Sequence, residues 1–267
     1  MPQVAVERDD RVVIVTITNP PMGYMDSGTV PELGAAMLEL EADESVRAVV
    51  ITGGLAGVFI RHYSVAELGA MSTVLRERGT SVDIESRLPE RDLDRVFRRM
   101  ETMPKPVIAA VNGLAMGGGF ELMLACDIRI AEEGDYQMGL PEITVGILPG
   151  AGGTQKLSRL VGMARALEMT LRGRTVSPRE ALALGIVQEL APAGGAMKAA
   201  LTMAHEMAAK PARASGYIKR LVRASVETPL EEGLALERTL FLDLMTTEEA
   251  HQLMSKMNAE NLDIRQL

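Results

Sequence analysis

Residues 107–125, VIAAVNGLAMGGGFELMLA, decide the fold because they join a buried strand to a glycine-opened helix through a tight turn. Residues 107–111 are wholly apolar and rich in β-branched side chains, which predicts a strand buried on both faces. Asn112-Gly113 is a turn signal. Three glycines at 117–119 then precede an apolar helical run that ends near Ala125. A strand and a helix this close together predict a layered α/β core.

The glycine-rich helix start places an acid beside backbone donors. The first N–H groups of a helix have no partner inside it and lie at the positive end of its dipole. Glycines let a ligand approach this backbone because no Cβ stands in the way. Glu121 follows Gly118 by three positions, so both lie on one face of the helix. Acyl chemistry uses an oxyanion donor next to a carboxylate, although a plain glycine-rich helix start with a favourable first-turn charge is the structural alternative.

A second acid lies in residues 139–155, GLPEITVGILPGAGGTQ. Glu142 follows Pro141 in a rigid turn just ahead of another glycine-rich loop, where an exposed turn glutamate is the simpler interpretation. Two carboxylates that share an apolar pocket do not both ionise freely, so one pKa rises. Glu121 and Glu142 together would then supply an acid and a base near neutral pH.

The composition excludes several classes of protein. The chain has 267 residues, a net charge of −8 and one cysteine, Cys126, so no intrachain disulfide forms and no basic face for nucleic acid is expected. No run reaches the ~18 apolar residues of a membrane helix, and residues 1–10 lack the apolar core of a signal peptide. No Cys/His cluster indicates a metal. We therefore expect a cytoplasmic protein that binds neither nucleic acid nor membrane.

Strands alternate with helices early in the chain, and only helices follow residue 195. The expected strands are 11–18, 46–52, 107–111, 127–131 and 186–190, and the expected C-terminal helices are 196–209, 213–225, 229–244 and 247–259. Residues 53–89 give no clear pattern, and 76–90 are polar and of mixed charge. The expected core includes Val13, Val15, Val49, Ile51, Ile108, Ala110, Leu122 and Ile128.

The two glycine-rich stretches together resemble the central signature of the enoyl-CoA hydratase/isomerase (crotonase) family. The matching segments are NGLAMGGGFELMLACDIRIA and GLPEITVGILPGAGGTQKLSRLVG, with further similarity in VRAVVIT and GRTVSPREALALGIVQEL. The resemblance implies an α/β fold, a crotonase-like spiral of ββα units over residues 1–194. It also implies a helical C-terminal oligomerisation region over 195–267 and assembly into a homotrimer or a dimer of trimers.

The resemblance also implies roles for individual residues. The N–H groups of Gly118 and Tyr63 match the two oxyanion-hole donors, and Glu121 and Glu142 match the glutamates that hold and activate water. Family isomerases often keep only the second acid, so the presence of both favours hydration of a 2-enoyl-CoA to a 3-hydroxyacyl-CoA. The coenzyme A thioester is then the substrate, with no other cofactor and no metal. Substrate contacts are expected at His62, Ser64, Gly117 and Leu140.

Three segments depart from the family pattern on the side that meets coenzyme A. Residues 58–68, VFIRHYSVAEL, replace a loop of small residues, which makes His62 and Tyr63 either an added acid/base pair or gate, or simply a repacked loop. Residues 19–28, NPPMGYMDSG, and 246–257, TTEEAHQLMSKM, are also altered. Glu260 falls where a basic residue often meets the phosphates of coenzyme A.

Several other functions stay open or are disfavoured. Within the family, isomerase, C–C lyase or hydrolase activity and a non-catalytic acyl-CoA-binding role remain alternatives. A dinucleotide enzyme is disfavoured because TGGLAG at 52–57 lacks the G-x-G-x-x-G spacing. A serine hydrolase is disfavoured because no G-x-S-x-G occurs.

Overall fold

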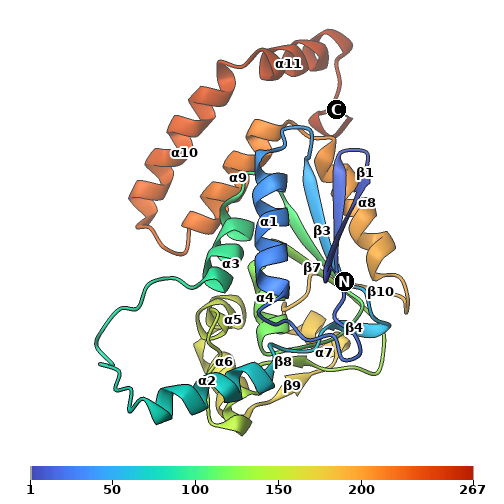
Figure 1. The fold of residues 1–267 in the computed structure, drawn as a ribbon. Helices are drawn as coiled ribbons and strands as arrows, with labels where there is room; N and C mark the ends of the chain where they lie inside the picture. The colour runs from blue at the N-terminus through green and yellow to red at the C-terminus, as the bar shows by residue number, and fades with distance from the viewer. Residues whose placement is uncertain (1, 267) are drawn as a thin grey trace.

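The computed structural model describes residues 2–266, whose main sheet has six strands in the order β1-β2-β3-β5-β7-β10 (Figure 1). Neighbouring strands are parallel, except that β1 and β2 are antiparallel. The strands are β1 (Val4–Asp9), β2 (Val12–Ile17), β3 (Ala48–Gly53), β5 (Val107–Val111), β7 (Ile128–Glu132) and β10 (Glu189–Ala191). β3 and β5 are buried at every position, as their almost wholly apolar sequences predict.

A second sheet of four short strands turns away from the first. It has the order β4-β6-β8-β9 and contains β4 (Gly57–Ile60), β6 (Gly113–Met116), β8 (Met138–Gly139) and β9 (Thr175–Val176). The bend after β5 requires glycine, because a Cβ on Gly113 would lie 1.9 Å from the carbonyl carbon of Gly57. Asn112 fixes the same corner, since its Nδ2 donates to the carbonyl oxygen of Gly53 at 2.8 Å. β3, β5 and β7 are each followed by a short strand of the second sheet, β4, β6 and β8 in turn, which is the predicted spiral.

The helices cover both faces of the main sheet. They are α1 (Thr29–Ala42), α2 (Val65–Glu77), α3 (Asp92–Thr102), α4 (Gly118–Ala125), α5 (Gly153–Val161), α6 (Met163–Arg172), α7 (Pro178–Ala183), α8 (Ala196–Ala208), α9 (Ala212–Ala224), α10 (Leu230–Met245) and α11 (Glu248–Glu260), with short 3-10 turns η1 (Glu142–Val145) and η2 (Ile264–Gln266). α4 is buried along its whole length. α8 lies on the opposite face and buries an alanine every four residues against β2, β3, β5 and β7.

The last helices extend beyond the sheets. α10 packs on α9 and α11 and stands well away from the main sheet (Figure 1). It exposes a run of large apolar side chains: Leu230, Leu234, Phe241, Leu242 and Met245. The four C-terminal helices begin and end within two residues of their predicted limits.

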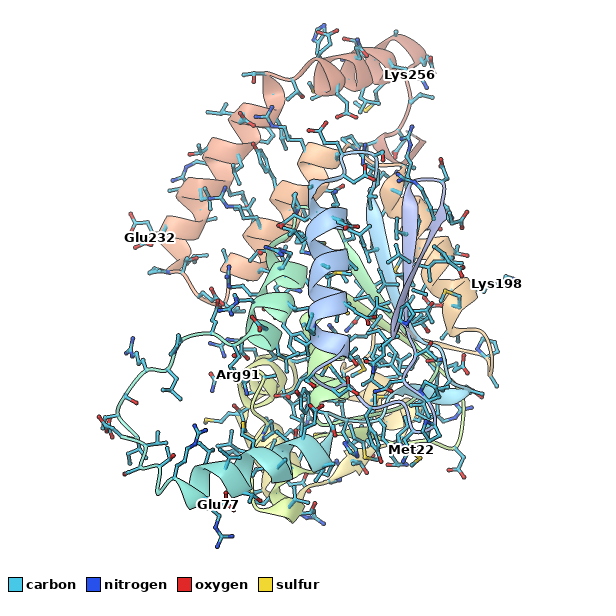
Figure 2. All side chains as sticks on the ribbon, in the orientation of Figure 1. Met22, Glu77, Arg91, Lys198, Glu232 and Lys256 are labelled. Carbon is cyan, nitrogen blue, oxygen red and sulfur yellow. The ribbon has the colours of Figure 1, made fainter. Side chains whose placement is uncertain are left out.

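The sequence prediction was right about the core and incomplete at the surface. Seven of the eight expected core residues are buried, whereas Ile128 is only half-buried because it begins β7 beside a cavity. The start of the strand predicted at 186–190 is wrong, because β10 begins only at Glu189. α2 was not predicted because none of its residues is buried, and the side chains near Glu77 extend into solvent (Figure 2). The two- to four-residue strands of the second sheet are too short to give a pattern.

Candidate active site

The first turn of α4 lies against the loop that carries Tyr63. A Cβ built on Gly118 would lie 3.3 Å from the Tyr63 nitrogen. Met25 pairs with the other side of this loop: its N–H donates to the His62 carbonyl at 2.9 Å, and its carbonyl accepts from Ser64 N–H at 2.8 Å. The Tyr63 N–H is therefore turned away from Met25. Within residues 2–266, neither this N–H nor that of Gly118 donates to a protein acceptor outside regular helix and strand bonding, so both remain available as donors.

Gly117 brings three parts of the site together at a point where only glycine fits. Its φ of +49° belongs to the left-handed region. A Cβ there would lie 3.2 Å from Glu142 Oε1 and 3.5 Å from His62 Cβ. Its N–H donates to the Gly139 carbonyl at 2.9 Å, so the start of α4, the His62 loop and the Glu142 turn converge here.

Glu121 is buried and anchored through one oxygen. Its side-chain Oε1 accepts hydrogen bonds from the N–H groups of Ala151, at 2.7 Å, and Gly153, at 2.8 Å. Burial raises the pKa of Glu121, while these two donors and the cations Lys156 and Arg91 oppose that rise. Oε2 accepts no hydrogen bond from the described residues, so one carboxylate oxygen is fixed and the other is free to act.

Glu142 carries a buried oxygen that has no hydrogen-bond partner. Its Oε2 is buried without a hydrogen-bond partner, the only such side-chain nitrogen or oxygen among the described residues. Burial raises the pKa of Glu142 to about 7, and the charge of Glu121 adds to the rise. Because buried polar groups in folded proteins are nearly always paired, this atom marks Glu142 as a candidate residue of the site.

The altered residues near the helix start are held by specific contacts. The Tyr63 hydroxyl donates to Glu67 Oε2 at 3.0 Å. Burial, together with this bond, raises the pKa of Tyr63 to about 12, so the hydroxyl stays neutral in the ordinary pH range. His62 Nδ1 lies 2.7 Å from the Tyr63 carbonyl oxygen, and its ring packs 4.7 Å from that of Tyr24.

The two N-terminal segments that depart from the family pattern contact each other. Tyr24, in residues 19–28, packs on His62, and Ser27 Oγ donates to Glu67 Oε1 at 2.7 Å. Ser64, predicted to contact substrate, caps α2 by accepting from Glu67 N–H at 3.3 Å. The two altered segments are therefore joined by a ring contact and a hydrogen bond.

Leu140 belongs to the core beneath the site. It is 2% exposed, and a Cβ on Gly153 would lie 2.9 Å from its Cδ1. A side chain on Gly153 would also crowd Pro149 Cβ, at 2.8 Å, and Glu121 Oε1, at 3.0 Å, so glycine suits this position. Leu140 supports the loop that holds Glu121, and a direct contact with substrate stays a prediction.

The sequence did not reveal the groups that orient Glu121. The N–H donors of Ala151 and Gly153 lie in the glycine-rich run at 146–153, which the sequence shows only as a loop that follows Glu142. The charge of Arg91 acts on Glu121, but nothing in the sequence singles out Arg91 from the other arginines of this charged region. The only signal in the sequence was that a small-residue loop follows Glu142, because small residues let backbone N–H groups approach a carboxylate.

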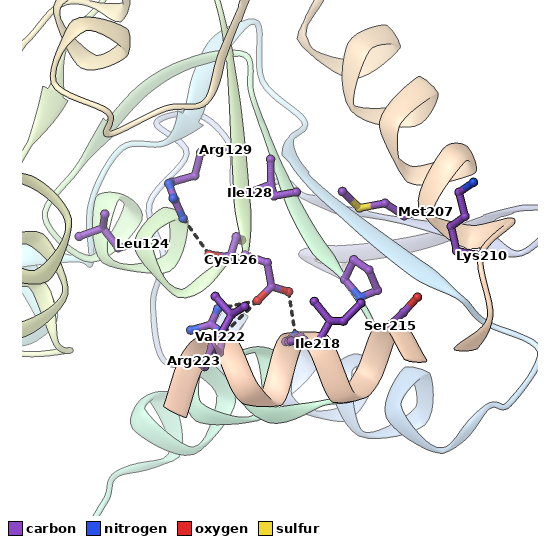
Figure 3. A pocket seen from close by; sticks show the side chains of 13 residues that line it. Leu124, Cys126, Ile128, Arg129, Met207, Lys210, Ser215, Ile218, Val222 and Arg223 are labelled. Atoms are coloured by element: carbon purple, nitrogen blue, oxygen red, sulfur yellow. Dashed lines mark hydrogen bonds and ion pairs between the residues drawn. The ribbon is translucent and has the colours of Figure 1, made fainter. Parts of the chain in front are cut away.

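A hollow lies at the C-terminal end of α4 (Figure 3). It has a volume of about 500 Å³ and is lined by Pro106, Leu124, Cys126, Asp127, Ile128, Arg129, Met207, Lys210, Ser215, Ile218, Lys219, Val222 and Arg223. Asp127 pairs there with Lys219 at 2.7 Å and with Arg223 at 2.8 Å. Burial raises the pKa of Cys126 to about 12, so its thiol stays protonated. This end of α4 carries satisfied ion pairs rather than reactive groups.

Two properties of residues 2–266 bear on the kind of site. No group of three or more His, Cys, Asp or Glu side chains there is arranged to hold a metal ion. None of the helices in that range is both long and apolar enough to cross a membrane.

Comparison with known proteins identifies the fold and the family. Residues 7–263 match the family model for enoyl-CoA hydratase/isomerase. The short-chain-enoyl-CoA hydratase of Clostridium acetobutylicum is 34% identical over 94% of this chain and 93% of its own length. The 2,3-dehydroadipyl-CoA hydratase of Escherichia coli is also 34% identical, over 94% of each chain.

Solved structures agree with this match. An enoyl-CoA hydratase from Bacillus anthracis superposes with a TM-score of 0.86 at 28% identity, covering 97% of both chains. Pseudomonas aeruginosa DspI superposes with the same TM-score at 31% identity, over 98% of this chain and 96% of its own. The fold is that of the crotonases, and the chain belongs to the enoyl-CoA hydratase/isomerase family.

Proposed function

We propose that the chain hydrates a 2-enoyl-CoA thioester to the 3-hydroxyacyl-CoA. The observation that carries this proposal is the pair of dissimilar acids: Glu142, whose Oε2 has no partner and whose pKa is about 7, and Glu121, anchored by two N–H groups. Both acids act beside the two backbone donors of Gly118 and Tyr63. Relatives named as hydratases, 34% identical over nearly the whole chain, support the same reaction.

The backbone donors would polarise the substrate. With the thioester carbonyl oxygen between the N–H groups of Gly118 and Tyr63, negative charge that develops on this oxygen is stabilised. Removing one such donor in other enzymes costs about 3 kcal/mol of transition-state stabilisation. Polarisation of the carbonyl makes Cβ electrophilic, which is the condition for water to add there.

The acids would divide the proton transfers. Glu121 is assigned as the base, because the N–H groups of Ala151 and Gly153 favour its charged form and leave Oε2 without a protein donor. It takes a proton from water as the oxygen adds to Cβ. Glu142, close to half protonated near pH 7, delivers a proton to Cα. One water is consumed, and proton exchange with solvent restores both acids.

We also propose that the molecule assembles as a homotrimer or a dimer of trimers. The support is the apolar surface of α10, where Phe241 is 59% and Leu242 63% exposed. Such side chains on a helix that stands away from the sheet are typical of an interface. Light scattering of the purified chain tests this proposal, and a monomer at micromolar concentration would contradict it.

The function is tested by turnover of a short and a medium 2-enoyl-CoA, followed through loss of the conjugated thioester absorbance. Glu121→Gln and Glu142→Gln should each lower kcat by about 100-fold or more while the variants still bind acyl-CoA. Glu133→Gln is the matched control, since this exposed glutamate pairs only with Arg179.

Two outcomes would contradict the proposal. If either acid variant kept turnover within about threefold of wild type, the acid pair would not be the catalyst. If the wild type bound acyl-CoA but isomerised a 3-enoyl-CoA without hydrating the 2-enoyl-CoA, the activity would be that of a family isomerase.

A further inference from the structure

Arg91 lies where the exposed loop after α2 enters α3 (Figure 2). Its guanidinium is held by Asp94, through Nε and Nη2 at 2.8 Å each, and Asp94 also accepts from the Arg91 backbone N–H at 2.9 Å. The same Nη2 donates to the Gly150 carbonyl oxygen at 2.5 Å. Arg91 thus joins the start of α3 to the loop that precedes α5.

The peptide bond between Gly150 and Ala151 is held on both sides. Its carbonyl accepts from Arg91, and its N–H donates to Glu121 Oε1 at 2.7 Å. Because a peptide unit is planar and rigid, rotating it would break both bonds together. A cation on the carbonyl also polarises the unit and strengthens its N–H as a donor.

α3 holds the far side of the same loop through a second cation. Lys156, in the first turn of α5, pairs with Glu101 near the end of α3 at 2.9 Å. A Cβ on Gly152 would lie 3.1 Å from Lys156 Nζ. The loop that carries both donors to Glu121 is therefore fixed to α3 at two points.

We propose that Arg91 is a positioning residue for Glu121, acting by fixing the Gly150–Ala151 peptide whose N–H orients the carboxylate. The kinetic part of this inference rests on the proposed hydration, whereas the geometric part does not. Arg91 itself meets neither water nor substrate in this role.

The charges around Glu121 give the direction of the expected effect. Arg91 and Lys156 favour its ionised form, and the carboxylate of Glu142 interacts with it unfavourably. Losing Arg91 removes both a cation and the constraint on one N–H donor. The pKa of Glu121 should therefore rise, and the acidic limb of the kcat/KM profile should move to higher pH.

The test compares Arg91→Gln and Arg91→Lys with Arg95→Gln. Arg95 lies one turn further along α3 and pairs only with exposed partners, Asp92 and the Glu90 carbonyl. We expect Arg91→Gln to lower kcat about 10-fold, with KM changed less than about twofold, and to move the acidic limb upward. Arg91→Lys keeps the charge and should move the limb less. Arg95→Gln should match wild type.

A second measurement needs no turnover. Hydrogen exchange of a peptide covering residues 146–156 should be faster in Arg91→Gln than in wild type, and Asp94→Asn, which frees the guanidinium, should change it in the same direction. If the wild type failed to hydrate any enoyl-CoA but this exchange rose, the proposed function would fall and the positioning role would stand. Unchanged exchange together with an unchanged pH profile would overturn the inference.

Discussion

The polar groups at the two ends of α4 differ in whether they have hydrogen-bond or ion-pair partners. At the N-terminal end, Glu142 Oε2 is buried without a partner, and the N–H groups of Gly118 and Tyr63 donate to no protein acceptor outside regular helix and strand bonding in residues 2–266. At the C-terminal end, Asp127 accepts from Lys219, Arg223 and the Val107 N–H, all at 2.7–2.8 Å. Polar groups at the N-terminal end of α4 lack protein partners, whereas Asp127 at the C-terminal end is fully paired.

This difference is more informative about function than the size of a hollow. The roughly 500 Å³ cavity lies at the satisfied end, where its charged groups already bond to one another (Figure 3). There Arg129 donates to the carbonyls of Cys126 and Ile186, at 2.8 and 2.7 Å. Unpaired polar atoms carry a free-energy cost that folding alone does not explain, so they mark the end of α4 where a ligand is expected to complete the bonding.

The substitution Asp127→Asn is expected to give the largest effect and tests the difference between the two ends of α4. Removing this charge leaves Lys219, whose side chain is 8% exposed, without its anion. We expect the free energy of unfolding to fall by about 3 kcal/mol, because a buried ion pair that loses one partner is strongly destabilised. Urea unfolding measures this change, and kcat per folded molecule should stay within about twofold of wild type. A large fall in kcat with unchanged stability would mean that the C-terminal end is also functional.

Glu142→Gln should have the opposite effect on stability, in a pH-dependent way. The folded pKa of about 7 lies above the ordinary value of 4.5, so folding favours the protonated acid. The contribution of this preference to the free energy of unfolding is fully present below about pH 4.5 and is lost as the pH rises through about 7. The variant should therefore equal wild type near pH 4.5 and exceed it by roughly 1–2 kcal/mol near pH 8.5, after allowance for solvent screening.

Thermal unfolding across this pH range measures the difference between wild type and Glu142→Gln. Glu133→Gln, at an exposed ion pair, is the control and should show no pH-dependent gain. If the curves of Glu142→Gln and wild type ran parallel at every pH, the carboxylate would be ordinarily solvated, and the contrast between the two ends of α4 would be lost.

Tyr63→Phe should have the smallest effect on stability and activity. It distinguishes the role of the Tyr63 hydroxyl from that of the Tyr63 backbone N–H. The variant loses the hydroxyl bond to Glu67 but keeps the Tyr63 N–H beside Gly118. Stability should fall by about 1 kcal/mol, the usual net worth of one hydrogen bond. Hydration should change by less than about threefold in steady-state assays. A loss of about 100-fold would show that the hydroxyl, not the N–H, takes part in catalysis.

The sequence predicted the parts of the molecule that repeat a local rule. Buried strands such as 107–111 and the amphipathic C-terminal helices follow hydrophobic periodicity, and Glu121 and Glu142 stand beside glycine-rich turns. The family resemblance added the two backbone donors and the spiral arrangement. These features can be predicted because neighbouring residues determine them.

What could not be predicted depends on contacts between distant segments. The bond from Arg91 to the Gly150 carbonyl joins residues that no local pattern connects, and the same is true of Ser27 and Glu67. The half-burial of Ile128 depends on where α9 packs. A pKa near 7 for Glu142 likewise requires knowing which surfaces close over the carboxylate.

The path of the chain from Ser64 to Glu90 has a consequence for how this molecule can diversify. It starts next to the donor Tyr63 and returns at Arg91, yet every residue from 71 to 90 is exposed. The entropic cost of closing such a loop grows only slowly with its length. Insertions, deletions and new side chains can therefore accumulate over these positions at little cost in folding free energy. The chain between Tyr63 and Arg91 is thus open to evolutionary change, while Glu121 and Glu142 keep their positions.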